Sequence, residues 1–296
     1  MISNFILKRK YNKALDYIKV SEFDKAVEIF NELVEKDYDL LNTYFYLGQI
    51  FFEECDFEKA LCYFDKSLLF DENNVDVLMY KGLIFYELKQ FNNALNVYEK
   101  VLKIQPDNLD AQFGKGIVLT VIKSYEDALN IFNKVLDIDD ENASRLYIKS
   151  YALIELDRFD EALDCLNKSL SLNPKNLEAL INKIFVLNNL DKFNEALKTS
   201  DEALNLSSSD YHIWLNRGIT LRNLNKLEDA LDCFEESLIL ETDDIDSLLN
   251  KALVLCKLNC LEDSLECYNK TLKLDHNNKY ALEGREEVLK KIKNND

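Results

Sequence analysis

Cysteine and histidine are the side chains of this sequence that could bind a metal or serve as nucleophile and base. The chain has seven Cys and two His. His212 and His276 fall in different segments, and Cys256 and Cys260 stand one helical turn apart without the further ligands that a zinc site needs. No Gly-rich phosphate loop, nucleophile elbow or HExxH motif occurs. We therefore expect no catalysis, no metal and no cofactor.

The cysteines themselves are expected to be free thiols. Their number is odd and no CxxC pair occurs, which is typical of a reducing compartment. No signal-peptide pattern and no run of about 18 apolar residues is present, so we expect a cytoplasmic protein with no membrane span. The seven are Cys55, Cys62, Cys165, Cys233, Cys256, Cys260 and Cys267.

The net charge limits the class of partner. With 36 basic and 54 acidic residues among 296, the chain has a formal charge of −18. Such a surface repels nucleic-acid phosphates and anionic lipid head groups. We expect no binding to nucleic acid or to membranes, and we expect a protein or peptide partner that is neutral or basic.

The elements that must position any site come from an internal repeat. An alanine recurs every 34 residues without insertion or deletion, and a serine takes the last place in the series. Around it, apolar residues at i, i+3, i+4 and i+7 occur twice per repeat, which predicts two amphipathic helices. The series is Ala26, Ala60, Ala94, Ala128, Ala162, Ala196, Ala230 and Ser264.

Other columns keep the same register. If the alanine is repeat position 20, position 24 is mostly aromatic, from Phe30 and Phe64 to Tyr268, and position 8 is mostly small, as in Gly48 and Gly82. Only 6 Gly and 2 Pro occur in the chain, which favours helices joined by short turns over a sheet-rich fold. Residues such as Pro106-Asp107-Asn108 end the repeats, because Pro and Asn stop helices and start turns.

A period of 34 residues with these columns resembles the tetratricopeptide repeat family over residues 7–278. The resemblance implies an all-α fold, a right-handed superhelical solenoid of eight helix-turn-helix repeats. Residues 1–6 would be a lead-in, and residues 279–296 a capping helix with a polar outer face. The expected repeats are 7–40, 41–74, 75–108, 109–142, 143–176, 177–210, 211–244 and 245–278.

Two features depart from the family pattern. Position 7, usually Leu in the family, is Lys or Arg in seven repeats, from Lys13 to Lys251. We expect the aliphatic stems of these side chains to cover apolar surface while the charges reach water. Position 8 of the sixth repeat is Ile184 instead of a small residue, so we expect that repeat to be wider or shifted locally.

The resemblance also implies that the first helix of each repeat lines a concave groove. Asparagine occupies position 6 of the last three repeats, in a pattern similar to the asparagine ladders of peptide-binding relatives. An amide can donate to and accept from a peptide backbone. The expected peptide-binding residues of this half are Asn182, Asn216 and Asn250, with Asn188, Asn189, Arg222 and Asn223 beside them.

The preceding repeats present aromatic and aliphatic side chains at positions 6 and 12. These would suit an amphipathic helix or an apolar segment, and self-association or binding of the chain's own terminus are alternatives. The expected residues are Tyr46, Phe52, Tyr80, Tyr86 and Ile154. Positions 5 and 9 are also apolar in nearly every repeat, and we assign them mainly to the core between neighbouring helices.

The two-carboxylate clamp of chaperone-binding relatives is not expected, because Glu178, His212 and Asp246 stand where that clamp would need Lys. The predicted function is a non-catalytic scaffold that binds a polypeptide segment in its groove. The alternatives are a structural subunit of a multiprotein assembly and a regulatory module of a separate enzyme.

Overall fold

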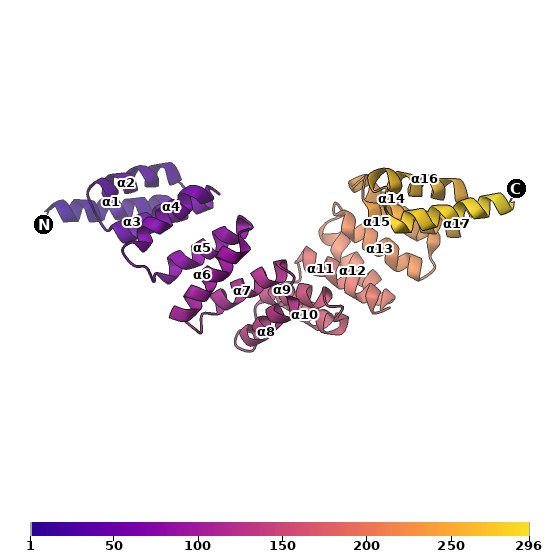
Figure 1. Ribbon diagram of the computed structural model, residues 1–296, viewed down its shortest axis with the longest axis horizontal. Helices are drawn as coiled ribbons and strands as arrows, with labels where there is room; N and C mark the ends of the chain where they lie inside the picture. The colour runs from indigo at the N-terminus through magenta and orange to yellow at the C-terminus, as the bar shows by residue number, and fades with distance from the viewer. Residues whose placement is uncertain (1, 296) are drawn as a thin grey trace. The chain divides into compact units, whose positions relative to one another are not determined.

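The computed structural model describes residues 2–295, which form seventeen α-helices and no strand (Figure 1). The predicted all-α repeat fold is confirmed. Two residues lie outside the described range: Met1, the first residue of the expected lead-in, and Asp296, the last residue of the expected capping helix. The helices are α1 (Ile2–Lys19), α2 (Phe23–Glu35), α3 (Leu40–Glu53), α4 (Phe57–Leu68), α5 (Val75–Glu87), α6 (Phe91–Ile104), α7 (Leu109–Val121), α8 (Tyr125–Leu136), α9 (Ala143–Ile154), α10 (Phe159–Leu172), α11 (Leu177–Asn189), α12 (Phe193–Leu206), α13 (Tyr211–Asn223), α14 (Leu227–Leu240), α15 (Ile245–Lys257), α16 (Leu261–Leu274) and α17 (Lys279–Asn295).

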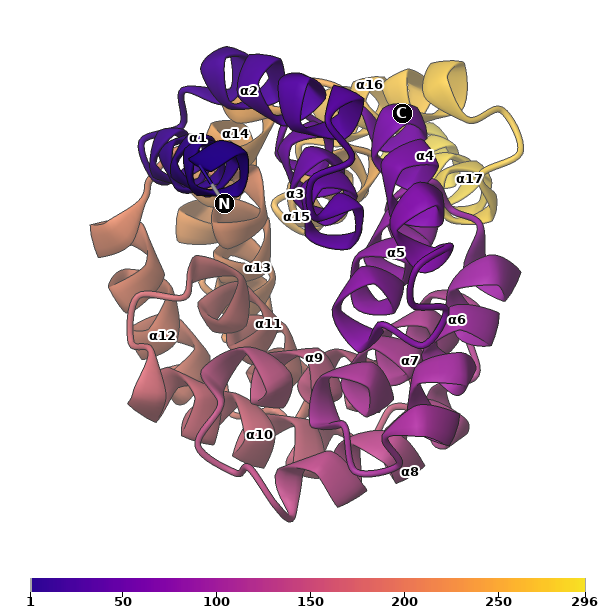
Figure 2. The same ribbon diagram turned by 90° about the vertical axis from the view of Figure 1, so that its left-hand side faces the viewer.

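The helices pack as consecutive pairs. We call the first helix of a pair an A helix and the second a B helix; Figures 1 and 2 show, for example, α5 beside α6. The helices group into two compact bodies, an N-terminal body (Met1–Ile138) and a C-terminal body (Asp139–Asp296). The last helix, α17, packs on α16 and α15.

Side-chain caps fix where the A helices begin. The Asn74 side chain accepts a hydrogen bond from the Val77 backbone N–H at 3.1 Å, which satisfies one of the free donors of the first turn of α5. The same cap opens the later A helices and α17. The capping residues are Asn74, Asn108, Asn142, Asn176, Asp210, Asp244 and Asn278.

A small residue on most A helices faces a large residue sixteen positions later on the B helix of the same pair. A Cβ placed on Gly116 would stand 2.4 Å from Phe132 Cε1, and one on Gly48 would stand 2.6 Å from Phe64 Cδ1. The ring therefore occupies the space that a side chain on the A helix would need. This contact brings the two helices of a pair close together.

Ile184 is compensated by its partner. The residue sixteen positions later is Ser200, and both side chains are fully buried, in α11 and α12 respectively. The large and the small residue are exchanged relative to the other repeats, so the total volume at the two positions is nearly kept. Helices α11 and α12 have 13 and 14 residues, as have α13 and α14, so these helices keep their usual lengths in this repeat.

Four of the seven basic residues at position 7 have ionic partners. Each of these four pairs with an acid sixteen residues earlier, on the B helix of the preceding pair, and we call the four pairs the ionic series. Lys115 Nζ lies 2.9 Å from Glu99 Oε1, and the same distance joins Lys251 Nζ to Glu235 Oε1. Such partly exposed pairs stabilise by about 0–1 kcal/mol each. The other two pairs are Lys81 with Asp65 and Arg217 with Asp201.

Arg285 of α17 occupies the same register, but the residue sixteen positions earlier is Asn269 instead of an acid. Its Nε is buried and has no hydrogen-bond partner among the described residues. A buried donor without a partner costs about 1–3 kcal/mol. The ionic series therefore does not extend to α17, where Arg285 has no acidic partner sixteen residues earlier.

Exchanging the volumes of Ile184 and Ser200 tests the compensation. Ile184→Ala should lower the free energy of unfolding by about 2–5 kcal/mol through a cavity, and Ser200→Phe by about 1–3 kcal/mol through overpacking. The double variant should be more stable than either single variant, because it restores the small-to-large arrangement of Ala14 and Phe30. Urea denaturation of the four proteins measures this, and additive losses would show that the two side chains do not compensate.

Replacing Asn269 with an acid should give Arg285 an ionic partner. Asn269→Asp should raise the free energy of unfolding by about 0.5–1 kcal/mol by pairing with Arg285. The gain should be absent when Arg285→Gln is present as well. Thermal unfolding of the single and double variants checks this, and an equal gain in both backgrounds would contradict the pairing.

Candidate functional site

The A helices of neighbouring pairs touch one another within each body. In the C-terminal body α9 contacts α11, α11 contacts α13, α13 contacts α15, and α15 contacts α17. Neighbouring B helices make sparse contacts at most in the described part of the chain. The A helices are therefore closer together and line the inner side of each body, and side chains at one repeat position form a row.

Asn188 and Asn216, two of the expected peptide-binding residues, are buried between A helices. Each is 8% exposed. Asn188 Nδ2 donates to the Asn216 carbonyl at 3.1 Å, and Thr220 Oγ1 lies 2.8 Å from both Asn188 Oδ1 and that carbonyl. Asn216 Nδ2 donates to the carbonyl of His212 at 2.9 Å. These amides connect α11 to α13.

Arg222 connects α13 to α15 in a similar way. Its guanidinium donates to Asn250 Oδ1 and, at 3.2 Å, to Asn223 Oδ1. Asn250 Nδ2 donates to the Asp246 carbonyl at 2.8 Å. Burial lowers the pKa of Arg222. Both functional groups of Asn250 are thus bonded within the chain.

Asn182 and Asn189 lie closer to solvent. Burial raises the pKa of Tyr147, as does the charge of Glu178, while a hydrogen bond with the half-buried Asn182 opposes the rise. Asn189 is exposed and donates to the Phe185 carbonyl at 2.9 Å. The expected ladder is thus distributed between helix–helix contacts and the surface.

Two of the expected aromatic residues, Tyr80 and Tyr46, pack on the repeat that precedes their own. Tyr80 stacks on Phe64 at 5.4 Å between ring centroids, lies 5.2 Å from Phe52, and accepts a hydrogen bond from Gln49 Nε2 at 2.7 Å. Tyr46 stacks on Phe30 at 5.9 Å.

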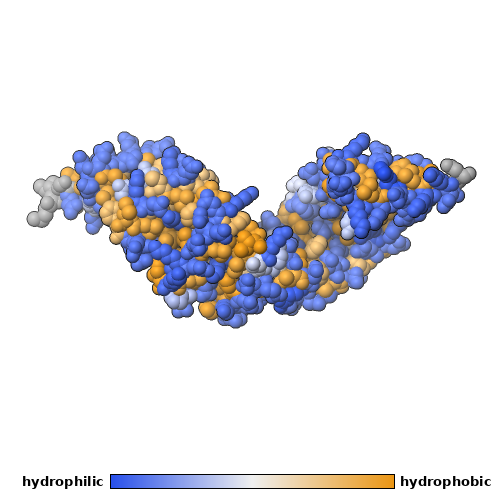
Figure 3. Space-filling model, in the orientation of Figure 1, coloured by the Kyte–Doolittle hydropathy of each residue, from blue (hydrophilic) through white to orange (hydrophobic). Residues whose placement is uncertain are grey.

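The two remaining residues of the aromatic set lie apart from this cluster. Tyr86 contacts Phe91, at 6.2 Å between ring centroids. Ile154 is half-buried on α9 of the C-terminal body, whereas the four aromatic residues belong to the N-terminal body. Figure 3 shows apolar residues gathered over α3 to α6 on one face of the N-terminal body.

Position 9 of the C-terminal body corrects our assignment of that column to the core. Tyr151 is 45% exposed, Phe185 40% and Leu253 43%, and Ile219 between the last two is half-buried. We call these four residues the apolar row. They stand on α9, α11, α13 and α15, which touch in that order. Sequence reasoning missed them as site residues because it assigned positions 5 and 9, which are apolar in nearly every repeat, mainly to packing.

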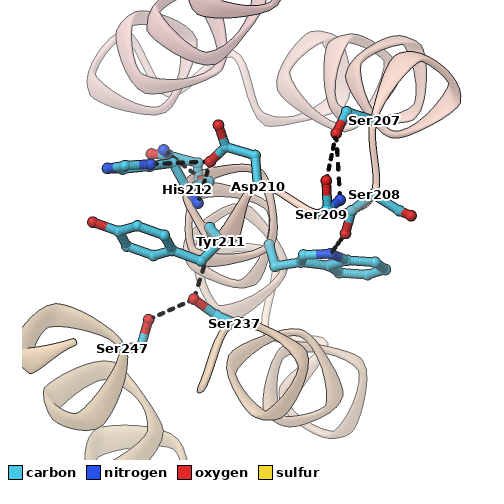
Figure 4. Close-up of polar contacts among 10 residues, drawn as sticks. Ser207, Ser208, Ser209, Asp210, Tyr211, His212, Ser237 and Ser247 are labelled. Carbon is cyan, nitrogen blue, oxygen red and sulfur yellow. Dashed lines mark hydrogen bonds and ion pairs between the residues drawn. The ribbon is translucent and has the colours of Figure 1, made fainter. Parts of the chain in front are cut away.

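Carboxylates surround the N-terminal ends of α13 and α15, beside the apolar row. Burial raises the pKa of Tyr211, and the nearby carboxylates of Asp244, Glu241 and Asp210 raise it further. Asp210 caps α13, and its Oδ1 also lies 3.0 Å from the ring Nδ1 of His212 (Figure 4). This end of the body is strongly negative.

Hydrogen bonds hold the start of α13 in place. Ser237 Oγ of α14 donates to the Tyr211 carbonyl at 3.1 Å and lies 2.8 Å from Ser247 Oγ of α15 (Figure 4). Trp214 Nε1 donates to the Ser208 carbonyl at 2.9 Å. The acidic end is therefore a fixed part of the body.

Family models match three segments of the chain. Two models of the tetratricopeptide repeat match residues 11–76 and 211–243, and a model of anaphase-promoting complex, cyclosome, subunit 3 matches residues 87–169. The chain belongs to the tetratricopeptide repeat family. A search of the curated proteins finds no match.

Solved structures similar to this tetratricopeptide repeat chain share its fold. YrrB, described as a tetratricopeptide protein with an unusual peptide-binding site, is 23% identical with a TM-score of 0.56, over 62% of this chain and 95% of YrrB. The Cut9–Hcn1 hetero-tetramer of the APC/C has 16% sequence identity to this chain and a TM-score of 0.67. The match covers 90% of this chain and 52% of the other. A tetratricopeptide repeat protein from Parabacteroides merdae has 17% sequence identity and a TM-score of 0.62, and the match covers 88% of this chain and 98% of the other.

The other chemistry-bearing residues of this repeat protein form no such surface. All seven cysteines are free thiols, and burial raises the pKa of Cys233 to about 11. Within residues 2–295, no three His, Cys, Asp or Glu side chains group as metal ligands would. No helix in that range has both the length and the apolar character needed to cross a bilayer.

Replacing the buried Asn188 should lower stability more than replacing its exposed neighbour Asn189. Asn188→Ala should cost about 1–3 kcal/mol of unfolding free energy, because it leaves buried polar groups of α13 without a partner. Asn189→Ala should change stability by less than about 0.5 kcal/mol, as exposed substitutions usually do. Urea denaturation measures both, and equal effects would contradict the structural role of Asn188.

Proposed function

We propose that this tetratricopeptide repeat protein is a non-catalytic scaffold that binds a polypeptide segment along the apolar row of its C-terminal body. The observation that supports this most is the exposure of three large apolar side chains, Tyr151, Phe185 and Leu253, at one position of touching helices. Contiguous exposed apolar surface on a folded protein marks a site of interaction.

The residues beside the row suit an extended or helical peptide. Asn189 and Asn223 are exposed one turn further along α11 and α13, where their amides can reach a bound backbone. Asn182 and Asn250, both half-buried, border the row on the side of the acidic helix ends. Of the expected ladder, Asn182, Asn189 and Asn223 are the members we propose to contact a ligand, because both functional groups of Asn250 are bonded within the chain.

The charge of the surface supports a neutral or basic partner. Asp246 lies on the same helix as Leu253, and Glu178 on the same helix as Phe185. Complementary charge speeds encounter and selects among partners, while apolar contact supplies most of the affinity. The peptide-binding site named for YrrB, which shares the fold, is consistent with this proposal.

A second candidate function is that of a structural subunit in a multiprotein assembly. It is favoured by the match of residues 87–169 to an anaphase-promoting complex subunit model and by the likeness to the Cut9–Hcn1 assembly. In that case a partner would cover surface outside the apolar row, and the row would contribute little to its affinity.

Selection from a displayed random-peptide library tests the first proposal. Peptides that bind the wild-type protein should bind at least about tenfold more weakly to the variant Tyr151→Ser, Phe185→Ser, Leu253→Ser, because about 1.4 kcal/mol of lost apolar contact corresponds to a factor of ten. Fluorescence anisotropy with the selected peptides gives the dissociation constants.

A matched control exists on the B helices. Leu172, Leu206 and Leu274 are 42–43% exposed at the ends of α10, α12 and α16. Changing these three to Ser removes a similar amount of exposed apolar surface and should leave peptide affinity unchanged. Equal loss of affinity in both triple variants, or no loss in either, would reject the apolar row as the binding surface.

A further inference from the structure

A cleft opens at the C-terminal end of the A-helix face, between α15 and α17. Its volume is about 360 Å³. Leu249 and Leu253 form its apolar wall on α15, and Tyr280, which is 74% exposed, stands on the α17 side. We call this the α15–α17 cleft. It has room for one large apolar side chain and the stem of another.

Carboxylates border the α15–α17 cleft. Asp246, Glu283 and Glu287 all line it. Burial, and then the charge of Asp244, raises the pKa of Asp246. Glu287 is paired with Lys291 at 2.8 Å, whereas Lys279 Nζ is 3.8 Å from Glu283. The cleft therefore combines an apolar wall with an excess of negative charge, and a basic apolar segment complements it.

Helix α1 has exposed apolar and basic side chains near its N-terminal end. It has 18 residues, whereas the other A helices have 12 to 14. Phe5 is 71% exposed and Ile6 50%. Lys8 and Arg9 follow one turn later, both exposed and without an ion-pair partner among the described residues.

The charge of α1 is opposite to that of the rest of the chain. Five of its residues are Lys or Arg and one, Asp16, is acidic, within a protein of formal charge −18. A cationic helix with exposed apolar residues is thus attached to an acidic molecule that offers a cleft with carboxylates around an apolar wall. The two surfaces match in both charge and polarity.

We propose that α1 of one copy docks into the α15–α17 cleft of a second copy, with Phe5 and Ile6 against Leu249 and Leu253 and with Lys8 and Arg9 beside Asp246 and Glu283. The contact joins different surfaces of the two copies, so it is heterologous and produces a ring or an open chain of molecules. The proposal goes beyond the proposed function because the occupant is the chain itself, although Leu253 belongs to both surfaces.

The size of the contact determines the conditions in which it forms. A single cleft buries less surface than a permanent interface, so association is expected in the micromolar to millimolar range. Because exposed charges contribute, the contact weakens as salt rises and the Debye length falls to about 3 Å at 1 M. Light scattering on the full chain should show a mass that increases with protein concentration at low salt and falls back toward one chain at high salt.

Two complementary charge-reversal variants make the test specific. The helix variant has Lys8→Glu and Arg9→Glu and keeps an intact cleft; the cleft variant has Asp246→Lys and Glu283→Lys and keeps an intact α1. Each alone should remain monomeric. Their mixture should assemble, with the two variants alternating in a ring or an open chain, because each α1 then meets a cleft of opposite charge. Thermal unfolding confirms that each variant is folded.

A chain with all four substitutions should assemble again, since the charges are reversed on both sides. A wild-type protein that stays monomeric at millimolar concentration and low salt overturns the proposal, as does assembly by either double variant alone or a folded four-fold variant that stays monomeric. Peptide binding is an independent readout. If the selected peptides still need the apolar row while the wild type is monomeric, self-docking is wrong and the proposed function stands.

Discussion

The close packing of a small residue on most A helices against a large one on the paired B helix is the contact on which the rest of the structure depends. Phe132 fills the space beside Gly116 so completely that a Cβ there would be 2.4 Å from the ring. Because the same contact recurs every 34 residues, each helix pair has nearly the same geometry as the next. Neighbouring A helices then touch at equivalent positions, and side chains at one position form rows. Both the ionic series and the apolar row follow from that register.

The fold could be predicted from the sequence because its signal is repeated eight times. Helix type, number and approximate limits follow from the alanine series and the apolar spacing around it. The expectation of a wider or shifted repeat at Ile184 came from treating one column at a time. Position 8 alone indicates a clash, whereas positions 8 and 24 together show that Ser200 provides the missing space. The ionic partners at position 7 were missed for the same reason, since Lys115 and Glu99 belong to different repeats.

The candidate site could be predicted only in part. An asparagine amide can bond to a ligand or to its own chain, and nothing in the identity of Asn188 decides between these. The decision depends on the approach of α13, whose Thr220 and Asn216 carbonyl lie within hydrogen-bonding distance. Position 9, by contrast, could have been assigned from helix geometry. Leu146, Ser150 and Leu153 define the buried stripe of α9, and Tyr151 lies about 100° around the helix from Ser150.

The separation of these roles explains how a regular array can have a specific surface. Residues such as Asn188 and Arg222 bond one A helix to the next, and a buried amide without its partner would be costly, so these positions maintain the register of the array. The side chains of the apolar row contribute less to packing because much of their surface faces solvent. Their size and shape can therefore differ from repeat to repeat at small cost in stability. Apolar contact at the row then supplies affinity, and the carboxylates at the ends of α13 and α15 select the charge of what binds.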